Sequence, residues 1–198
     1  MPSEVACLIA ALDRPAGGSS DFDLNPPVML PEGRVLRQAA VLVGLWQRAG
    51  RVEVILTKRA SHLKHHPGQI AFPGGKVEAF DAGPEAAALR EAEEEIGLSV
   101  ANVQVLALLP PHETVTGFTV MPVLGLIRDD FVAVRDPGEV EEVFTVPLGH
   151  LLSPERYVIE GRVWLGQVRR YYAVPWGPYY IWGATARILR GLAERVAG

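Results

Sequence analysis

The chain alternates between continuous apolar runs and segments with helical periodicity. Residues 37–47, RQAAVLVGLWQ, are rich in Val and Leu, which predicts a strand buried on both faces. The turn-like residues 48–50 and the run VEVILTKR over 52–59 predict the partner strand of a hairpin. Further strands are expected at 102–111, at 118–127 and in a second hairpin at 163–174, and residues 142–153 predict a strand that leads into a short helix.

Three segments have the composition of helices. Residues 84–96 consist almost wholly of Ala, Leu, Glu and Arg, which are strong helix formers. Pro84 suits the first turn of this helix and Gly97 suits the position just past its end. Residues 3–12 and 182–196 predict an opening and a closing helix.

The order of these segments predicts a mixed α/β fold with a short N-terminal extension. Pro15, Gly17, Gly18, Ser19 and Ser20 follow the opening helix and predict a flexible link. We therefore expect an extension over 1–34, packed on or flanking the domain, and one domain over 35–198. Pro and Gly residues predict that 61–75 is mostly loop.

Composition and charge exclude several classes of protein. The chain has 198 residues, of which 48% are hydrophobic and 21% charged, as in globular proteins. Its net charge of −4 argues against a globally basic nucleic-acid binder, although a local basic cluster remains compatible.

The single cysteine, Cys7, excludes an intrachain disulfide and a multi-cysteine zinc site. No run approaches the roughly 18 apolar residues of a membrane helix, and the start makes a poor signal peptide, so we expect a cytoplasmic protein without a membrane partner.

The helix predicted at 84–96 carries three carboxylates on one face. At about 100° per residue, Glu91, Glu94 and Glu95 fall within one narrow arc, while Leu89, Ala92 and Ile96 share another arc that can pack on a sheet. Like charges at these spacings repel one another. A hard divalent cation such as Mg²⁺ or Mn²⁺ prefers carboxylate oxygens, so its binding makes the close approach of the three carboxylates favourable. The alternative is a solvated acidic face on which Arg90 partly compensates Glu94.

The segment before this helix contains two adjacent glycines. Gly74 and Gly75 lead into an acidic loop with Glu78 and Asp81. Glycine lets the backbone approach a ligand closely, so the turn is a candidate cradle for a metal-bound phosphate. The alternative is a tight turn that only happens to precede a helix.

Residues 74–98, GGKVEAFDAGPEAAALREAEEEIGL, resemble the Nudix box, the signature of hydrolases that cleave a nucleoside diphosphate linked to another group. The second half of the box matches at Arg90, Glu91, Ala92, Glu94, Glu95, Gly97 and Leu98. The first half departs from the pattern, because Asp81 takes the place of the early Glu and eight residues rather than seven separate it from Arg90. The departure puts the role of Asp81 in doubt, but not that of the helix.

A second motif resembles the segment that marks the coenzyme A pyrophosphatase branch of this family. It spans 55–75, ILTKRASHLKHHPGQIAFPGG, and matches at Thr57, Arg59, Ala60, Gly68, Phe72, Pro73, Gly74 and Gly75. Ile55 replaces a Leu and Lys64 replaces the second Arg of the motif. The one-residue-longer loop before the helix also fits this branch.

The resemblance implies a Nudix-type α/β/α sandwich with a mixed β-sheet, in which the box helix carries the metal site. It implies Mg²⁺ or Mn²⁺ as cofactor, with Glu91 and Glu95 as ligands and Glu94 as a third ligand or a partner through water. The carbonyl of Gly75 completes the ligand set by analogy with the family. Arg90 is expected to orient a carboxylate rather than to touch the substrate.

The implied reaction is hydrolysis of the diphosphate of coenzyme A, or of its derivatives, to 4′-phosphopantetheine and adenosine 3′,5′-bisphosphate. The basic stretch 58–66 supplies Lys58, Arg59 and Lys64 as candidate phosphate ligands, next to Gly74 and Gly75. The alternative for this stretch is an exposed basic loop.

The general base stays open at the level of sequence. It is either a glutamate of the box or one of three glutamates on a later segment, Glu139, Glu141 and Glu142. Each of these three is equally compatible with ordinary acidic surface before a strand.

Three other interpretations remain. A Nudix pyrophosphatase for ADP-ribose or NADH-type dinucleotides would not need a site for the 3′-phosphate. A non-catalytic nucleotide-sensing module often loses box carboxylates, which this chain keeps. A structural α/β protein would carry both motifs by chance. We expect a small-molecule substrate, and the sequence leaves a homodimer open.

Overall fold

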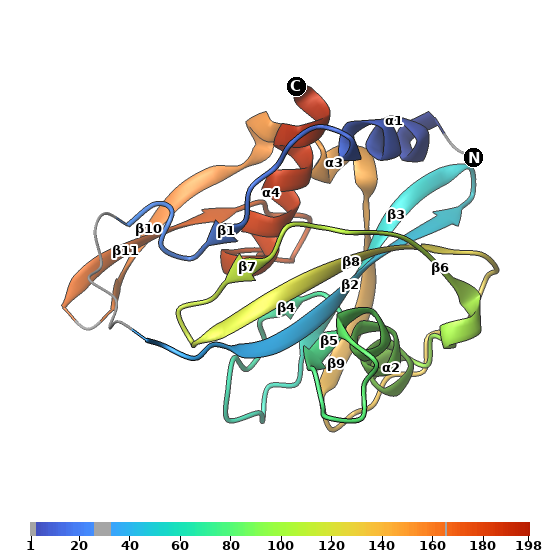
Figure 1. Ribbon diagram of the computed structural model, residues 1–198, viewed down its shortest axis with the longest axis horizontal. Coiled ribbons are helices and arrows are strands. Elements are labelled where there is room, and N and C mark those ends of the chain that lie inside the picture. Colours follow the sequence, from blue (N-terminus) through green and yellow to red (C-terminus); the bar gives the residue numbers. More distant parts are fainter. Residues whose placement is uncertain (1–2, 26–32, 165) are drawn as a thin grey trace.

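The structure is a computed structural model that describes residues 3–25, 33–164 and 166–198 (Figure 1). In chain order its elements are α1 (Ser3–Leu12), β1 (Ser19–Ser20), β2 (Arg37–Arg48), β3 (Arg51–Arg59), β4 (Ile70–Ala71), β5 (Gly74–Lys76), α2 (Pro84–Ile96), a 3₁₀ turn (Val100–Asn102), β6 (Val103–Leu108), β7 (His112–Glu113), β8 (Phe118–Ile127), β9 (Val140–Pro147), α3 (Leu148–Leu151), a 3₁₀ turn (Pro154–Arg156), β10 (Val158–Trp164), β11 (Gln167–Ala173) and α4 (Gly183–Ala197).

In the described part of the chain, a nine-stranded mixed sheet forms the centre of the molecule. Its main path runs β1-β7-β8-β2-β3-β4, while β5 pairs with β2, β6 with β8 and β9 with β3. Strand β2 runs parallel to β8 and antiparallel to β3. The mixed α/β fold expected from the order of segments is therefore confirmed.

Helices cover both faces of this sheet (Figure 1). Val43 and Leu45 of β2 belong to the apolar cluster that includes α4 and α1. Leu42 and Trp46 of the same strand belong to the cluster that includes α2. Because side chains alternate along a strand, the apolar run of β2 fills both clusters, and its predicted burial on two faces is confirmed.

The ends of α2 follow from the residues that flank it. Pro84 occupies the first turn, where its missing N–H costs no hydrogen bond. Gly97 ends the helix with φ of 69°, a left-handed conformation that favours glycine. Residues at the two ends of the segment therefore determine where α2, and with it the acidic face, begins and ends.

Two hairpins lie where the sequence predicts them. The β2–β3 turn contains Ala49 and Gly50 with φ of 47° and 77°, the positive values of a tight hairpin turn. The second hairpin consists of β10 and β11, so its first strand begins earlier, at Val158. This hairpin is a separate two-stranded sheet.

The N-terminal segment differs from the prediction of a flexible link. Val5 and Leu8 of α1 are fully buried in the core, and Ser19–Ser20 forms β1, which pairs in parallel with β7. Backbone pairing with a distant strand here overrides a local composition typical of loops. Residues 26–32 of the predicted link lie outside the described residues, and the boundary between 34 and 35 stays a prediction.

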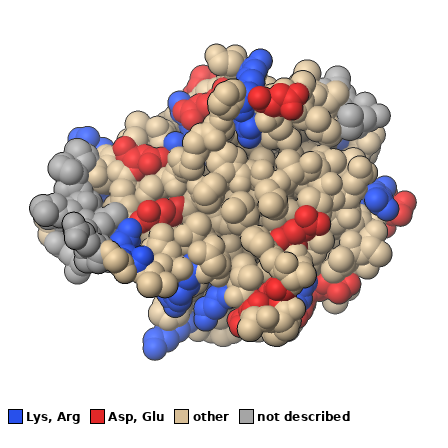
Figure 2. Space-filling model, in the orientation of Figure 1, with Lys and Arg blue, Asp and Glu red and all other residues tan. Residues whose placement is uncertain are grey.

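Surface charge on the molecule is mixed. Figure 2 shows acidic and basic side chains interspersed around a centre formed mostly by other residues. None of the helices in the described ranges has both the length and the apolarity to cross a membrane.

Candidate active site

Glu95 is a carboxylate buried at the base of the acidic helix face. Its residue is 4% exposed, and its Oε2 accepts a hydrogen bond of 3.1 Å from the Gly74 N–H. Burial raises the pKa of Glu95 to about 8, against the opposing effects of the Gly74 amide and of Arg59. The fold therefore holds this carboxyl where an added positive charge would be strongly favoured.

Glu91 lies against the second glycine of the turn. A Cβ placed on Gly75 would lie 2.5 Å from the carboxyl carbon of Glu91, so only glycine fits this position without moving the glutamate. Burial raises the pKa of Glu91, while Arg90 acts in the opposite direction. The double glycine thus forms a cradle around the Glu91 and Glu95 carboxylates.

Arg90 organises the acidic groups around the box helix. Its Nε and Nη2 donate to the two carboxylate oxygens of Asp81, each at 2.9 Å. Its Nη1 donates to Glu91 at 3.0 Å and to Glu94 at 2.8 Å. These contacts are the orienting geometry that the sequence predicts for Arg90.

Asp81 is the residue whose role the sequence leaves in doubt. Its side chain is 3% exposed, and the hydrogen bonds from Arg90 hold its pKa below the usual range. Asp81 therefore remains charged and fixes Arg90 from the loop that precedes the helix.

The donor set fits a hard divalent cation in chemical type. Glu91 and Glu95 offer desolvated carboxylates, and the backbone of Gly75 lies beside Glu91. Glu94, which is 61% exposed at the side chain, is held by Arg90. Among the described residues, no three acidic, histidine or cysteine side chains already form a closed metal cluster. A bound cation would have to draw the glutamates together.

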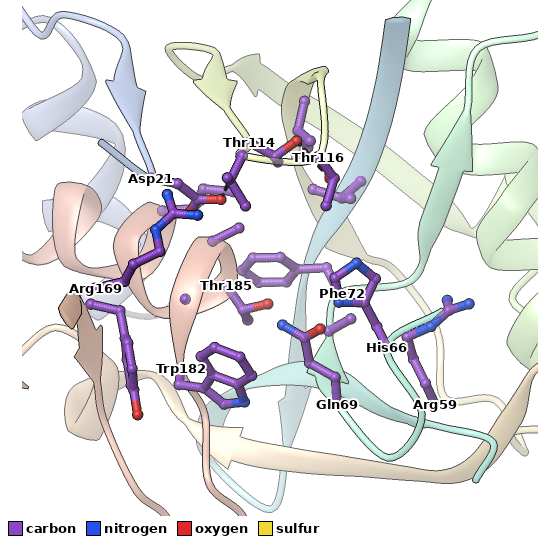
Figure 3. A pocket seen from close by; sticks show the side chains of 18 of the residues that line it. Asp21, Arg59, His66, Gln69, Phe72, Thr114, Thr116, Arg169, Trp182 and Thr185 are labelled. Atoms are coloured by element: carbon purple, nitrogen blue, oxygen red, sulfur yellow. Dashed lines mark hydrogen bonds between the residues drawn. The ribbon is translucent and has the colours of Figure 1, made fainter. Parts of the chain in front are cut away.

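A cavity of ≈ 510 Å³, shown in Figure 3, is lined by Arg59, whose charge acts on Glu95 of the box helix. Apolar and aromatic side chains cover much of its wall, among them Phe72, Trp182 and Ile188. Arg59 and Arg169 lie on opposite sides in Figure 3. The other two arginines of the lining are Arg162 and Arg170.

Arg59 connects the cavity to the box helix. It lines the cavity, and its charge lowers the pKa of Glu95. Lys58, the next residue along the strand, donates instead to Glu141 at 2.6 Å. Lys64 is exposed. Within the described part of the chain, neither lysine, nor Gly74 or Gly75, lines the cavity.

The three candidate general bases have different surroundings. Glu141 accepts hydrogen bonds from Lys58 and Ser61, and Glu142 accepts one of 2.5 Å from the Tyr179 hydroxyl. Glu139 acts electrostatically on both Glu91 and Glu95, raising their pKa values. Of the three, Glu139 is the one whose charge acts on the carboxylates of the box helix.

Glu139 reaches this position through a loop fixed to the end of α2. The Asp136 N–H donates to the carbonyl of Glu95 at 2.9 Å, and the Glu139 N–H donates to the carbonyl of Asp136 at 3.1 Å. The spacing of residues along the chain gives no signal of this contact.

Several lining residues have no counterpart in the motifs. Asp21 comes from the N-terminal segment, Trp182 from the start of α4, and the arginines other than Arg59 from the β10–β11 hairpin. His66 lines the cavity in a left-handed conformation with φ of 54°, a strained geometry often found at functional sites. Only tertiary folding brings these residues together.

Comparison with known proteins identifies the class of this fold and site. The NUDIX domain model matches residues 35–165, so the chain belongs to the Nudix family. Two relatives, both named uncharacterized Nudix hydrolase NudL, come from Enterobacter sp. (strain 638) and Salmonella typhimurium (strain LT2). Each is 42% identical over 177 residues, covering 89% of this chain and 92% of the relative.

A solved structure supports the fold. A MutT/nudix family protein from Enterococcus faecalis aligns with a TM-score of 0.54 at 20% identity, over 86% of this chain and 65% of that one. The protein is a Nudix hydrolase. Enzymes of this family act on small molecules and generally use divalent ions such as Mg²⁺ or Mn²⁺.

Proposed function

We propose that the protein hydrolyses the diphosphate of coenzyme A, in the presence of Mg²⁺ or Mn²⁺, to 4′-phosphopantetheine and adenosine 3′,5′-bisphosphate. The observation that carries this proposal is the distribution of arginines around the cavity. Arg59 lies at the end next to Glu95, and three further arginines come from the β10–β11 hairpin.

Coenzyme A matches this arrangement because it carries two separate anionic groups. Its diphosphate would lie between Arg59 and the box helix, and its 3′-phosphate would reach the arginines of the hairpin, which bind phosphate well. The aromatic walls formed by Phe72 and Trp182 suit the adenine ring. The likeness of 55–75 to the coenzyme A motif supports the same substrate.

The carboxylates of the box helix have separate roles in this proposal. Glu91 and Glu95 would hold the cation, with Glu94 and the carbonyl of Gly75 as further ligands. When bound, the cation neutralises diphosphate oxygens and lowers the pKa of a bound water. Arg90 keeps Glu91 and Glu94 oriented through the hydrogen bonds described above.

Glu139 is the proposed general base. Water attacks one phosphorus of the diphosphate, the bond between that phosphorus and the bridging oxygen breaks, and Glu139 accepts the proton of the water. The second phosphate leaves with the bridging oxygen. Glu141 and Glu142 are less suited because Lys58 and Tyr179 already engage them.

A comparison of substrates tests the proposal. We expect kcat/KM for coenzyme A to exceed that for 3′-dephospho-coenzyme A by roughly tenfold or more, because charged hydrogen bonds to the 3′-phosphate contribute about 1.5–3 kcal/mol. Arg162→Gln should reduce this preference, whereas Arg51→Gln, at the β2–β3 turn, should leave it unchanged.

Equal turnover of the two substrates, with faster cleavage of ADP-ribose or NADH, would contradict the coenzyme A assignment and favour a dinucleotide pyrophosphatase. Binding of nucleotides without turnover of any of them would favour a sensing module.

A further inference from the structure

The hairpin that carries the additional arginines is not part of the main sheet. Strands β10 and β11 pair only with each other in the described sheets, and Arg162 lies directly opposite Arg169 in their register. Isolated two-stranded hairpins are marginally stable, and neighbouring like charges repel. The position of these cations must therefore be fixed by other parts of the chain.

One of those parts is the N-terminal segment Ser19–Asn25, which we call the strap. At its far end, Asn25 clasps the backbone of Arg170: its Nδ2 donates to the Arg170 carbonyl at 2.9 Å and its Oδ1 accepts from the Arg170 N–H at 2.7 Å. The Nδ2 of Asn25 also donates to the carbonyl of Asp21 at 3.0 Å. These bonds act on the backbone, so they do not depend on the charge of the arginine.

The other end of the strap is fixed by His112 of β7, which is 0% exposed. Its Nδ1 lies 2.9 Å from Ser19 Oγ and its Nε2 lies 3.2 Å from Asp21 Oδ1. The second oxygen of Asp21 accepts from the Val115 N–H at 2.9 Å. Every polar atom of this buried imidazole thus binds the strap.

A third anchor joins the strap to the closing helix. Asp23 accepts a hydrogen bond of 2.8 Å from Nε of Arg187 in α4. The strap consequently links β7, β11 and α4, and residues in or next to each of these elements line the cavity. Figure 3 shows Asp21 of the strap on the same side of the cavity as Arg169.

We propose that the strap is a specificity element, in which Asn25 is a positioning residue that holds the arginines of the hairpin at the site of the substrate's 3′-phosphate. The inference rests on the proposed function, because the far end of the cavity has this role only if the substrate carries that phosphate. Asn25 acts through Arg170 and leaves the chemistry at the box helix unchanged.

The chain offers a matched control for Asn25. Asn102 makes the same two-bond clasp on the backbone of Asp129, with its Nδ2 donating and its Oδ1 accepting at 2.9 Å each. Neither Asn102 nor Asp129 lines the cavity in the described structure. Asn25→Ala and Asn102→Ala therefore remove the same two-bond clasp at different places, and Asn25→Ala removes in addition the bond to the Asp21 carbonyl.

Steady-state kinetics on coenzyme A and 3′-dephospho-coenzyme A test the inference. Loss of the two hydrogen bonds to Arg170 in Asn25→Ala should raise KM for coenzyme A about five- to tenfold, with kcat and the KM for 3′-dephospho-coenzyme A unchanged. Asn102→Ala should leave the ratio of the two KM values at the wild-type level. A wild-type preference for coenzyme A that persists in Asn25→Ala overturns the inference and leaves the proposed function intact.

Amide hydrogen exchange tests the clasp without any substrate. In Asn25→Ala the Arg170 N–H should exchange faster than in the wild type, and in Asn102→Ala it should not. Unchanged exchange in Asn25→Ala overturns the role of Asn25 whatever the substrate. If the wild type does not distinguish the two coenzymes, the proposed function fails, and the specificity role fails with it.

Discussion

At the scale of single residues, the buried carboxyl of Glu95 is the most informative group. A pKa of about 8 means that the cation-free site holds a proton at neutral pH. Binding of a divalent ion requires the carboxylate form, so it should release protons. Burial destabilises the charged carboxylate of Glu95 while the site is free of metal. The same burial makes the site selective for an added cation, which neutralises that charge.

This burial predicts how stability depends on pH in the presence of a chelator. The ordinary pKa of the carboxyl is 4.5 and its folded value is about 8, so between these values the folded state binds more protons than the unfolded state. Stability contributed by protonated Glu95 is present below pH 4.5 and is lost as the pH rises through 8.

Glu95→Gln removes this loss. At pH 8 and above, its free energy of unfolding in EDTA should exceed that of the wild type by a few kcal/mol, on the order set by the pKa difference, and the excess should shrink towards pH 4. Urea unfolding at several pH values measures it, with the exposed Glu93→Gln as control. An excess of the same size at all pH values would argue against the raised pKa.

Gly75 gives a second prediction at this scale. In Gly75→Ala the new methyl group would meet the Glu91 carboxylate at 2.5–2.6 Å, so Glu91 must leave its position. We expect Mn²⁺ affinity to fall by about tenfold or more, as when the support of a metal ligand is removed. Mn²⁺ titration followed by EPR measures this, with Gly17→Ala, where nothing lies within 4 Å of the new Cβ, as control. Unchanged affinity in Gly75→Ala would contradict the cradle.

Asp81 shows the limit of comparing the sequence with the box pattern residue by residue. Its spacing departs from the box pattern, and sequence gives no reason for an aspartate there. The structure supplies the reason, because both of its oxygens bind Arg90. The loop before the helix is one residue longer than in the usual box, and the contact between Asp81 and Arg90 compensates for this difference. A rule based on residue spacing does not contain such a contact.

At the scale of elements, the sequence was sufficient to predict the bounds of strands and helices that are long and have a local pattern. Strands β2 and β3 and helices α2 and α4 lie within one or two residues of their predicted bounds, since apolar periodicity and terminal residues such as Pro84 and Gly97 act within each segment.

The short strands were beyond this kind of prediction. β1, β4 and β5 have two or three residues each, too few for any periodicity. They form because neighbouring strands offer unpaired backbone groups. The predicted link is shorter than expected for this reason, because Ser19 and Ser20 pair with β7, whereas residues 15–18 have no regular secondary structure.

At the scale of the whole molecule, the carboxylates of the box helix and the residues of the cavity differ in how well they can be predicted from the sequence. The carboxylates of the box helix lie within one continuous motif and were predictable from spacing. The cavity collects residues from Asp21 to Ile188, so its composition depends on how the sheet, the hairpin and α4 pack. Of the basic residues predicted to bind substrate, Arg59 lines the cavity, whereas Lys58 binds Glu141 and Lys64 is exposed.

We propose that the box helix and the arginine-lined cavity together cleave the diphosphate of coenzyme A. Mass spectrometry of the products formed from coenzyme A with Mg²⁺ or Mn²⁺ is the decisive test. We expect 4′-phosphopantetheine and adenosine 3′,5′-bisphosphate from the wild type, and neither from Glu95→Gln. Intact coenzyme A, loss of the 3′-phosphate alone, or undiminished cleavage by Glu95→Gln would contradict it.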